Sequence, residues 1–285
     1  MRSDAPGVRW STAVRRPAVW LGAALVALVL LAALLPDLFT SVAPDDCRLA
    51  DSLRGPSPGH PLGFTRQGCD TFARVVHGTG PSVAVGLIAT VGAAVIGVAV
   101  GSAAGMFGGW LDAVLSRIGE VFLSIPVLLA VIVVVSVVVA EVDAWVVGGS
   151  IGAFAWPGTA RVVRAETMRL RVSGFVVAAE AMGLGRAGIL VRHILPNLVA
   201  PVVVLMSFTL AGAIGAEATL SFLGVGLPPG TISWGSDIAA AQTGLRRAPL
   251  VLLYPCVALA VAVVAFLLLG EALRGILDPR VGARR

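Results

Sequence analysis

Titratable and nucleophilic side chains that could do chemistry are scarce in this sequence. Three histidines occur, His60, His77 and His193, and no carboxylate–histidine spacing typical of a metal site accompanies them. The chain has no lysine, so the Gly-x-x-x-x-Gly-Lys-Ser/Thr loop that holds nucleotide phosphates cannot occur. We therefore predict a non-catalytic protein with no metal site and no cofactor of its own.

One carboxylate in an unusual position is Glu217, which lies in an apolar run close to Ser221 and Phe222. An ionisable group inside a membrane-spanning segment is costly and usually faces a cavity or a partner. Two interpretations stay open. Glu217, with Ser221 and Phe222, could belong to an outer gate or pathway, or it could make a structural hydrogen bond between a helix and a loop.

The composition indicates a membrane protein. Hydrophobic residues make up 57% of the chain and charged residues only 13%, whereas soluble domains carry about 25% charged residues. The mean hydropathy is +0.93. The pI of 10.3 could suggest nucleic acid, but the arginines lie beside apolar runs, where they set membrane topology. We expect lipid, and no nucleic acid, around this chain.

Several apolar runs approach the roughly 20 residues needed to cross a bilayer, and backbone groups in lipid must be satisfied within a helix. The first run ends at Pro36-Asp37, a poor cleavage site, which favours an uncleaved span over a signal peptide. We predict an all-α integral membrane protein with six transmembrane helices, at about Ala18–Leu35, Val83–Phe107, Val121–Ala140, Trp145–Val163, Leu198–Phe222 and Leu250–Gly270. Glycines spaced four apart in the second run predict close helix packing.

Arginines predict the orientation, because they concentrate on the cytoplasmic side of membrane proteins. They cluster in both terminal tails and in the loop between the fourth and fifth spans, which six spans place on one side. The predicted organisation is a cytoplasmic tail (1–17), a first transmembrane helix (18–36), an extracytoplasmic connector (37–80), a transmembrane core (81–272) with a cytoplasmic loop (164–197), and a cytoplasmic tail (273–285).

The connector contains Cys47 and Cys69. Two thiols on the oxidising side of a membrane suggest a disulfide that holds the connector compact. Sequence gives no Cα separation, so two unpaired thiols remain the alternative. Asp70 is placed to cap a short helix that leads into the second span.

The loop between spans four and five predicts a surface helix. Phe175 to Met182 reads as a short helix with small residues on one face, and Gly183 permits the left-handed turn that ends it. A second helical piece runs to Leu195, and Pro196 then starts the next span, where its missing N–H costs little. Such a helix could dock into a groove on a soluble partner.

The stretch Phe175–Asn197 resembles the EAA loop of binding-protein-dependent ABC importer permeases, whose motif has Glu-Ala-Ala, a glycine and a final Leu-Pro. Ala178, Ala179, Gly183 and Leu195-Pro196 match these positions, whereas Val177 stands at the glutamate and Glu180, one turn later, is a candidate for the carboxylate. Further matches are 217–224, 233–235 and 277–280. Arg192 and His193 are typical of the dipeptide and oligopeptide branch.

This resemblance implies a type I ABC importer permease fold in a bacterial cell membrane, both termini cytoplasmic. It implies a C-type subunit for di- or oligopeptides that pairs with a homologous B-type permease, an extracytoplasmic binding protein, and two ATPase subunits or one fused ATPase, which would hold ATP and Mg. The residues that would couple to the ATPase are Ala178, Ala179, Glu180, Gly183, Arg192, His193 and Pro196.

Alternatives stay open. Nickel-chelate and glutathione permeases share these signatures. An ion-coupled secondary carrier is a further alternative from another class, but we see no convincing internal repeat and few mid-span charges of the kind such carriers use.

Overall fold

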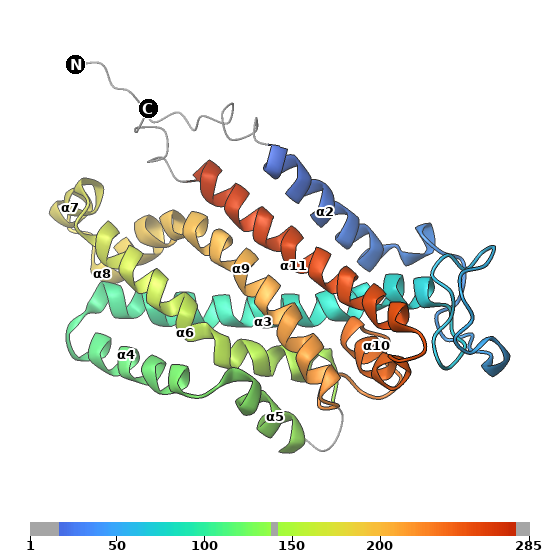
Figure 1. Cartoon of the computed structure of the whole chain (residues 1–285). Helices are drawn as coiled ribbons and strands as arrows, with labels where there is room; N and C mark the ends of the chain where they lie inside the picture. Colours follow the sequence, from blue (N-terminus) through green and yellow to red (C-terminus); the bar gives the residue numbers. More distant parts are fainter. Residues whose placement is uncertain (1–16, 138–141, 278–285) are drawn as a thin grey trace.

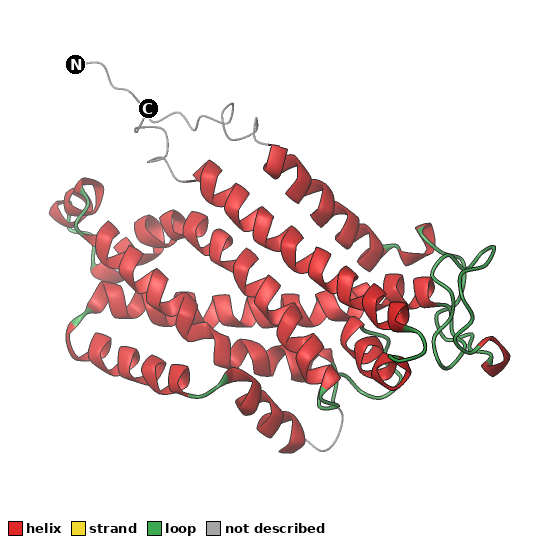
Figure 2. Ribbon diagram, viewed as in Figure 1, coloured by secondary structure: helices red, strands yellow, loops and turns green. Residues whose placement is uncertain are grey.

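The computed structural model describes residues 17–137 and 142–277. In these ranges the regular structure is helical, with isolated bridges but no β-strand (Figure 2). The helices are α2 (Pro17–Leu34), α3 (Thr71–Phe107), α4 (Gly109–Ser124), α5 (Val127–Val137), α6 (Ala144–Arg171), α7 (Gly174–Ala181), α8 (Arg186–Ile189), α9 (Leu195–Phe222), α10 (Trp234–Ala241) and α11 (Pro249–Leu277). A π-helical turn, Leu190–Ile194, joins α8 to α9. The all-α prediction is confirmed.

The long helices run side by side and form a bundle in which α3 packs against α6 and α9 (Figure 1). On one flank α11 packs against α2 and α9, and on the other α4 and α5 lie along α6. Figure 1 shows α7 and α8 at one end of the bundle and α10 with the loops that precede α3 at the opposite end. The predicted coupling segment, in α7 and α8, therefore lies at the opposite end of the bundle from α10, which packs against α9, the helix that carries Glu217.

Among the residues that the structure describes, three helical segments are long and apolar enough to cross a membrane: Thr71–Phe107, Arg186–Phe222 and Pro249–Ile276. A fourth is obtained when α4 and α5 are counted as one bent span, and Val19–Leu34 is apolar but shorter. The chain is therefore a multi-pass membrane protein, and the count of six stays a prediction.

The predicted third span is wrong as a continuous helix, because α4 and α5 meet at a bend of 84°. Pro126 separates them, and Ile125 before it is extended, with φ −92° and ψ 123°. Proline lacks the N–H for the helical ladder and disfavours helical dihedrals in the preceding residue. The end of that predicted span, residues 138–140, lies outside the described residues.

Two predicted boundaries also move. The connector was predicted over 37–80, but α3 already begins at Thr71 because Asp70 accepts a hydrogen bond from the Ala73 N–H (2.6 Å) as its N-cap. The loop predicted to begin at residue 164 begins after Arg171, because α6 continues past the apolar run. The last turn of α6 carries Arg169 and Arg171, and Arg169 forms an ion pair with Glu166.

Helices α3 and α6 approach closely through glycine, as the four-residue spacing predicted. A Cβ on Gly101 would lie 2.4 Å from the Ala160 carbonyl oxygen, and one on Gly152 would lie 2.6 Å from the Ala89 carbonyl oxygen. Real Cβ atoms are essentially never found this close to another atom. The backbones therefore contact each other directly, which is a common way to gain dispersion energy in lipid.

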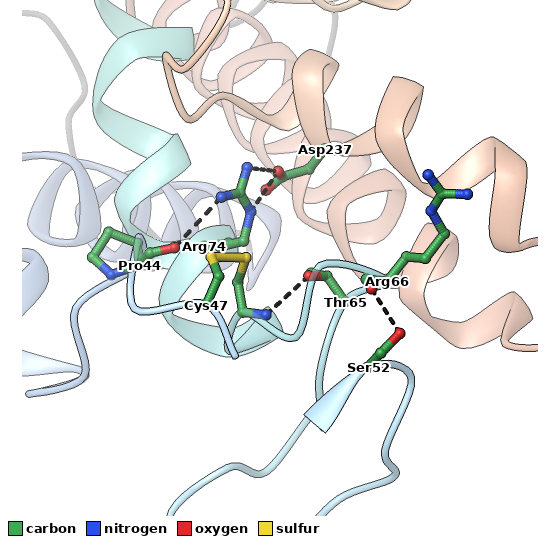
Figure 3. The surroundings of a disulfide bond; sticks show 8 residues. Pro44, Cys47, Ser52, Thr65, Arg66, Arg74 and Asp237 are labelled. Carbon is green, nitrogen blue, oxygen red and sulfur yellow. Dashed lines mark hydrogen bonds and ion pairs between the residues drawn. A yellow bond between two sulfur atoms is a disulfide. The ribbon is translucent and has the colours of Figure 1, made fainter. Parts of the chain in front are cut away.

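The connector is tied down at several points (Figure 3). A disulfide joins Cys47 to Cys69. The Cys69 N–H donates to Thr65 Oγ1 (3.2 Å), and the Ser52 hydroxyl donates to the Arg66 carbonyl (2.7 Å). Since the segment has only short 3-10 turns and bridges, these links hold it in one shape.

We expect the double change Cys47→Ser and Cys69→Ser to loosen the connector. The disulfide closes a loop with a sequence separation of 22 residues, and a loop of this length is worth about 3 kcal/mol in the chain-entropy treatment. Faster proteolysis within the connector of the purified protein would measure the loss. Cys256→Ser, which changes a free cysteine, is the control, and equal proteolysis of all three proteins would contradict the expectation.

Candidate functional site

Helix α7 is held against the end of the bundle by one buried face. Val176 and Ala179, 0% and 1% exposed, belong to an apolar cluster that also contains Leu170 of α6 and Ile194 and Leu198. Spacing of three places both residues on the same side of a helix. The α7 helix is therefore a packed part of the fold.

The outward face of α7 is mostly apolar, with one carboxylate, Glu180. Phe175 is 44% exposed, Val177 54% and Met182 74%, and Ala178 and Glu180 are also exposed. Ala179 was predicted, together with Ala178, to couple to the ATPase from an exposed helix, but its side chain is buried in the cluster beneath α7. A partner at this surface would contact Ala178 and the larger apolar side chains around it.

The turn after α7 adopts the predicted geometry. Gly183 has φ +86°, a conformation that costs a residue with a Cβ roughly 1–2 kcal/mol. The Leu184 N–H donates to the Ala179 carbonyl and the Gly183 N–H to the Glu180 carbonyl, so the turn closes the helix end.

The residues that lead into α9 lie next to the π-helical turn. Arg192 is exposed and His193 half-buried within it, and Pro196 lies in the first turn of α9. The Asn197 amide donates to the His193 carbonyl (2.7 Å). Single π-helical turns inside longer helices are frequent at functional sites, which supports this segment as the connection between α7 and α9.

At the opposite end, Glu217 of α9 is fully buried and accepts three hydrogen bonds. The hydroxyls of Ser82 (3.0 Å), Ser221 (2.8 Å) and Ser233 (3.1 Å) all donate to its carboxylate. These serines come from α3, α9 and the residue that precedes α10. Of the two interpretations, this geometry supports the structural hydrogen bond between helices and a loop. Phe222 is 41% exposed and does not join the cluster.

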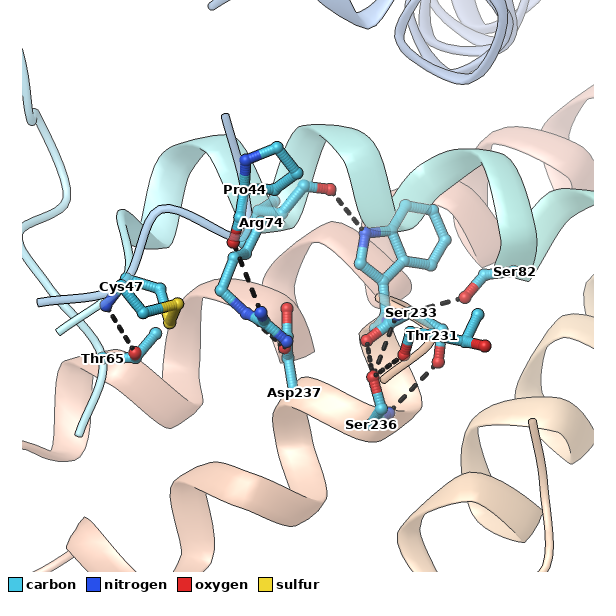
Figure 4. A network of polar contacts seen from close by, with 12 residues as sticks. Pro44, Cys47, Thr65, Arg74, Ser82, Thr231, Ser233, Ser236 and Asp237 are labelled. Carbon is cyan, nitrogen blue, oxygen red and sulfur yellow. Dashed lines mark hydrogen bonds and ion pairs between the residues drawn. A yellow bond between two sulfur atoms is a disulfide. The ribbon is translucent and has the colours of Figure 1, made fainter. Parts of the chain in front are cut away.

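Helix α10 is fixed by this cluster and by a second set of contacts (Figure 4). The Trp234 backbone N–H donates to Ser82 Oγ (3.3 Å), and its indole N–H donates to the Val75 carbonyl (3.0 Å). Ser233 and Ser236 form a capping box that starts the helix. The start of α10 therefore depends on α3 for its position.

Arg74 of α3 and Asp237 of α10 form an ion pair that also fixes α10. The guanidinium Nε lies 2.8 Å from the carboxylate, and a second guanidinium nitrogen contacts the Pro44 carbonyl. Burial raises the pKa of the Asp237 carboxyl above its usual range, and the charge of Arg74 opposes this shift. The pair links the connector, α3 and α10 (Figure 3).

Sequence reasoning missed most of these partners. Ser82 lies 135 residues from Glu217 and Arg74 lies 163 residues from Asp237, so no local pattern joins them. In contrast, Arg117–Glu120 and Glu271–Arg274 have the local spacing of three that a single sequence can reveal, and both are exposed surface pairs of the kind that contribute little to stability.

Comparison with known proteins identifies the family. Residues 97–283 match the binding-protein-dependent transport system inner membrane component. The glutathione transport system permease protein of Pectobacterium atrosepticum is 37% identical, over 80% of this chain and 75% of the relative. The dipeptide transport system permease protein of Alkalihalophilus pseudofirmus is 32% identical, over 91% and 85%. The peptidoglycan transport system permease protein of Agrobacterium fabrum is 36% identical, over 77% and 57%.

The match covers well over half of the chain and includes the α7 loop, and it agrees with an all-α bundle that carries several apolar helices. The fold is therefore the type I importer permease fold. This chain belongs to the binding-protein-dependent inner membrane components, the permease subunits of ABC importers.

Proposed function

We propose that this chain is the C-type permease subunit of an ABC importer for di- and oligopeptides. It forms the translocation pathway with a homologous B-type permease and receives substrate from an extracytoplasmic binding protein. Two ATPase subunits, or one fused ATPase, supply ATP hydrolysis with Mg. Relatives named for dipeptide and glutathione transport support a peptide-like substrate. A glutathione or nickel-chelate substrate is the alternative.

The single observation that carries this proposal is the geometry of α7. A short helix is fixed to the bundle by Val176 and Ala179 and presents Phe175, Val177 and Met182 outward. It lies at the end where α6 finishes in Arg169 and Arg171, which is the cytoplasmic side by the arginine bias. Both termini are then cytoplasmic. A force applied to α7 by an ATPase would reach α9 through α8 and the π-helical turn.

Uptake of radiolabelled dialanine into proteoliposomes tests the proposal. The chain is reconstituted with its permease, ATPase and binding-protein partners, and the control vesicles lack only the ATPase. We expect uptake that requires ATP and the ATPase and that ionophores leave unchanged. Uptake that persists without the ATPase, or that collapses with an ionophore, would contradict ATP-driven import.

Gly183→Val is expected to uncouple ATP hydrolysis from uptake. No atom lies within 4 Å of the position a Cβ would take, so the change acts through backbone strain at φ +86°. Strain of 1–2 kcal/mol or more corresponds to roughly a tenfold fall in uptake, with little loss of folded protein.

The matched control is Gly188→Val in α8, where a Cβ also meets open space and φ is not positive. It should transport like the unchanged protein. Normal ATP-driven uptake by Gly183→Val would remove the proposed role of the α7 turn.

A further inference from the structure

Helix α4 is attached to α6 near each of its ends (Figure 1). Near its start, Asp112 accepts hydrogen bonds from Arg164 (Nη2 to Oδ2, 2.7 Å) and from the Ser116 hydroxyl (3.1 Å). Near its end, the Phe122 ring packs against Trp156 with ring centroids 5.4 Å apart. In the described part of the chain, Arg164 makes the only side-chain hydrogen bonds that join α6 to α4. This ion pair is therefore the directional link between the two helices.

Helix α5, the other half of the bent span, is anchored elsewhere. Val131 and Val135 of α5, 0% and 6% exposed, lie in a buried cluster with Val147 of α6 and Leu220 of α9. Val147 belongs to the first turn of α6, at the opposite end of that helix from α7. The two halves of the span are thus fixed to opposite ends of α6.

The junction between α4 and α5 has the properties of a hinge. The Ile125 N–H donates to the Phe122 carbonyl within α4, and the Ala130 N–H donates to the Pro126 carbonyl at the start of α5. Among the described residues no backbone hydrogen bond joins α5 back to α4, because the helical ladder stops at proline. A few residues at the end of an element can absorb the change in backbone angles when two packed bodies rotate.

The end of α6 that holds α4 is also the end that holds α7. Met106 of α3 and Leu170 of α6 lie in the same buried cluster as Val176 and Ala179 of α7. Arg164 precedes the end of α6 by about two helical turns. A displacement of α7 therefore acts on the part of α6 to which α4 is joined.

We propose that Asp112 and Arg164 are positioning residues for transport, whose ion pair makes α4 move with the α7 end of α6 about a hinge at Ile125 and Pro126. Helix α5 stays with the opposite end of the bundle, so a force on α7 changes the angle between α4 and α5. The inference rests on the proposed function, because that function supplies the force at α7.

The ratio of dialanine imported to ATP hydrolysed by the complete importer in proteoliposomes tests the role of the pair. We expect Asp112→Asn to lower this ratio about fivefold, which corresponds to the roughly 1 kcal/mol that a partly exposed charge pair contributes. The thermal midpoint should fall by only a few degrees. The exchange of both residues, Asp112→Arg with Arg164→Asp, restores opposite charges and should recover most of the ratio.

Glu120→Gln is the matched control, because it also converts a carboxylate of α4 to an amide but has its partner, Arg117, on the same helix. It should leave the ratio unchanged. Three results would overturn the inference: a normal ratio in Asp112→Asn, an equal loss in Glu120→Gln, or a loss that the double exchange does not recover. A merely structural pair would reduce the amount of folded importer and leave the ratio as it is.

Spin labels across the hinge test the movement itself. Val114→Cys on α4 and Val133→Cys on α5 are exposed positions for the labels, in a protein that carries Cys256→Ser. We expect ATP binding by the ATPase to change the distance between the labels, and Asp112→Asn to reduce this change. A constant distance in an importer that takes up dialanine would overturn the hinge alone. If the unchanged importer takes up no dialanine, the proposed function fails, and the label distance still decides the hinge.

Discussion

Glu217→Ala is expected to destabilise the permease by about 3 kcal/mol or more, because three buried hydroxyl groups lose their shared acceptor. The change also removes the contact that joins α3, α9 and the start of α10. Thermal unfolding of the purified complex would show the loss as a lower midpoint, and peptide uptake should fall with the amount of folded protein.

Glu217→Gln distinguishes a structural role from a charge-dependent one. The amide oxygen can still accept from Ser221 and Ser233, and the amide N–H can donate to Ser82 Oγ where the Ser82 hydroxyl now donates, so we expect stability and uptake close to those of the unchanged protein. Thr219→Ala, an exposed position on the same helix whose hydroxyl bonds only the Gly215 carbonyl, is the control. A stable Glu217→Ala protein, or a Gln variant that folds normally but transports nothing, would contradict the structural role.

Gly152→Val is expected to prevent α3 and α6 from packing. The added Cβ would lie 2.6 Å from the Ala89 carbonyl oxygen, and backbone on both sides leaves no flexible group to move. Forced overpacking typically costs 1–3 kcal/mol, and a backbone clash should lie at or above about 3 kcal/mol. We expect a large loss of folded protein in the membrane fraction, measured by size-exclusion chromatography of fluorescent fusions.

The control is Gly149→Val, one turn earlier on α6, where a Cβ meets nothing within 4 Å. Because the two changes add the same side chain to the same helix, intrinsic helix propensity cancels. Equal yields of the two variants would show that α3 and α6 are not in direct backbone contact.

Local patterns predicted much of the bundle. The apolar runs placed α2 and α9 within a few residues of their observed bounds, and they placed the start but not the end of α11. The Gly183 turn was predicted from one residue type. Long-range contacts were not predictable: a single sequence does not show that Glu217 meets Ser82 and Ser233, or that Asp112 meets Arg164. The break at Pro126 was not predicted from the third apolar run, because a hydropathy profile carries no information on whether a residue has a backbone N–H.

The burial of Ala179 could not be predicted from the sequence motif either. A motif gives the residue types of α7 but not the direction in which each side chain points. Only the packing against Leu170, Ile194 and Leu198 shows that Ala179 supports the helix from beneath.

This division of α7 into a fixed inner face and a free outer face has an evolutionary consequence. Substitutions at Phe175, Val177 and Met182, which are exposed, would alter the surface offered to an ATPase at little cost to the bundle, since exposed positions tolerate change. Val176 and Ala179 would stay constrained by their own protein. Related importers could therefore exchange or share their energy-supplying subunits through a few surface substitutions, while the membrane part of the permease stays the same.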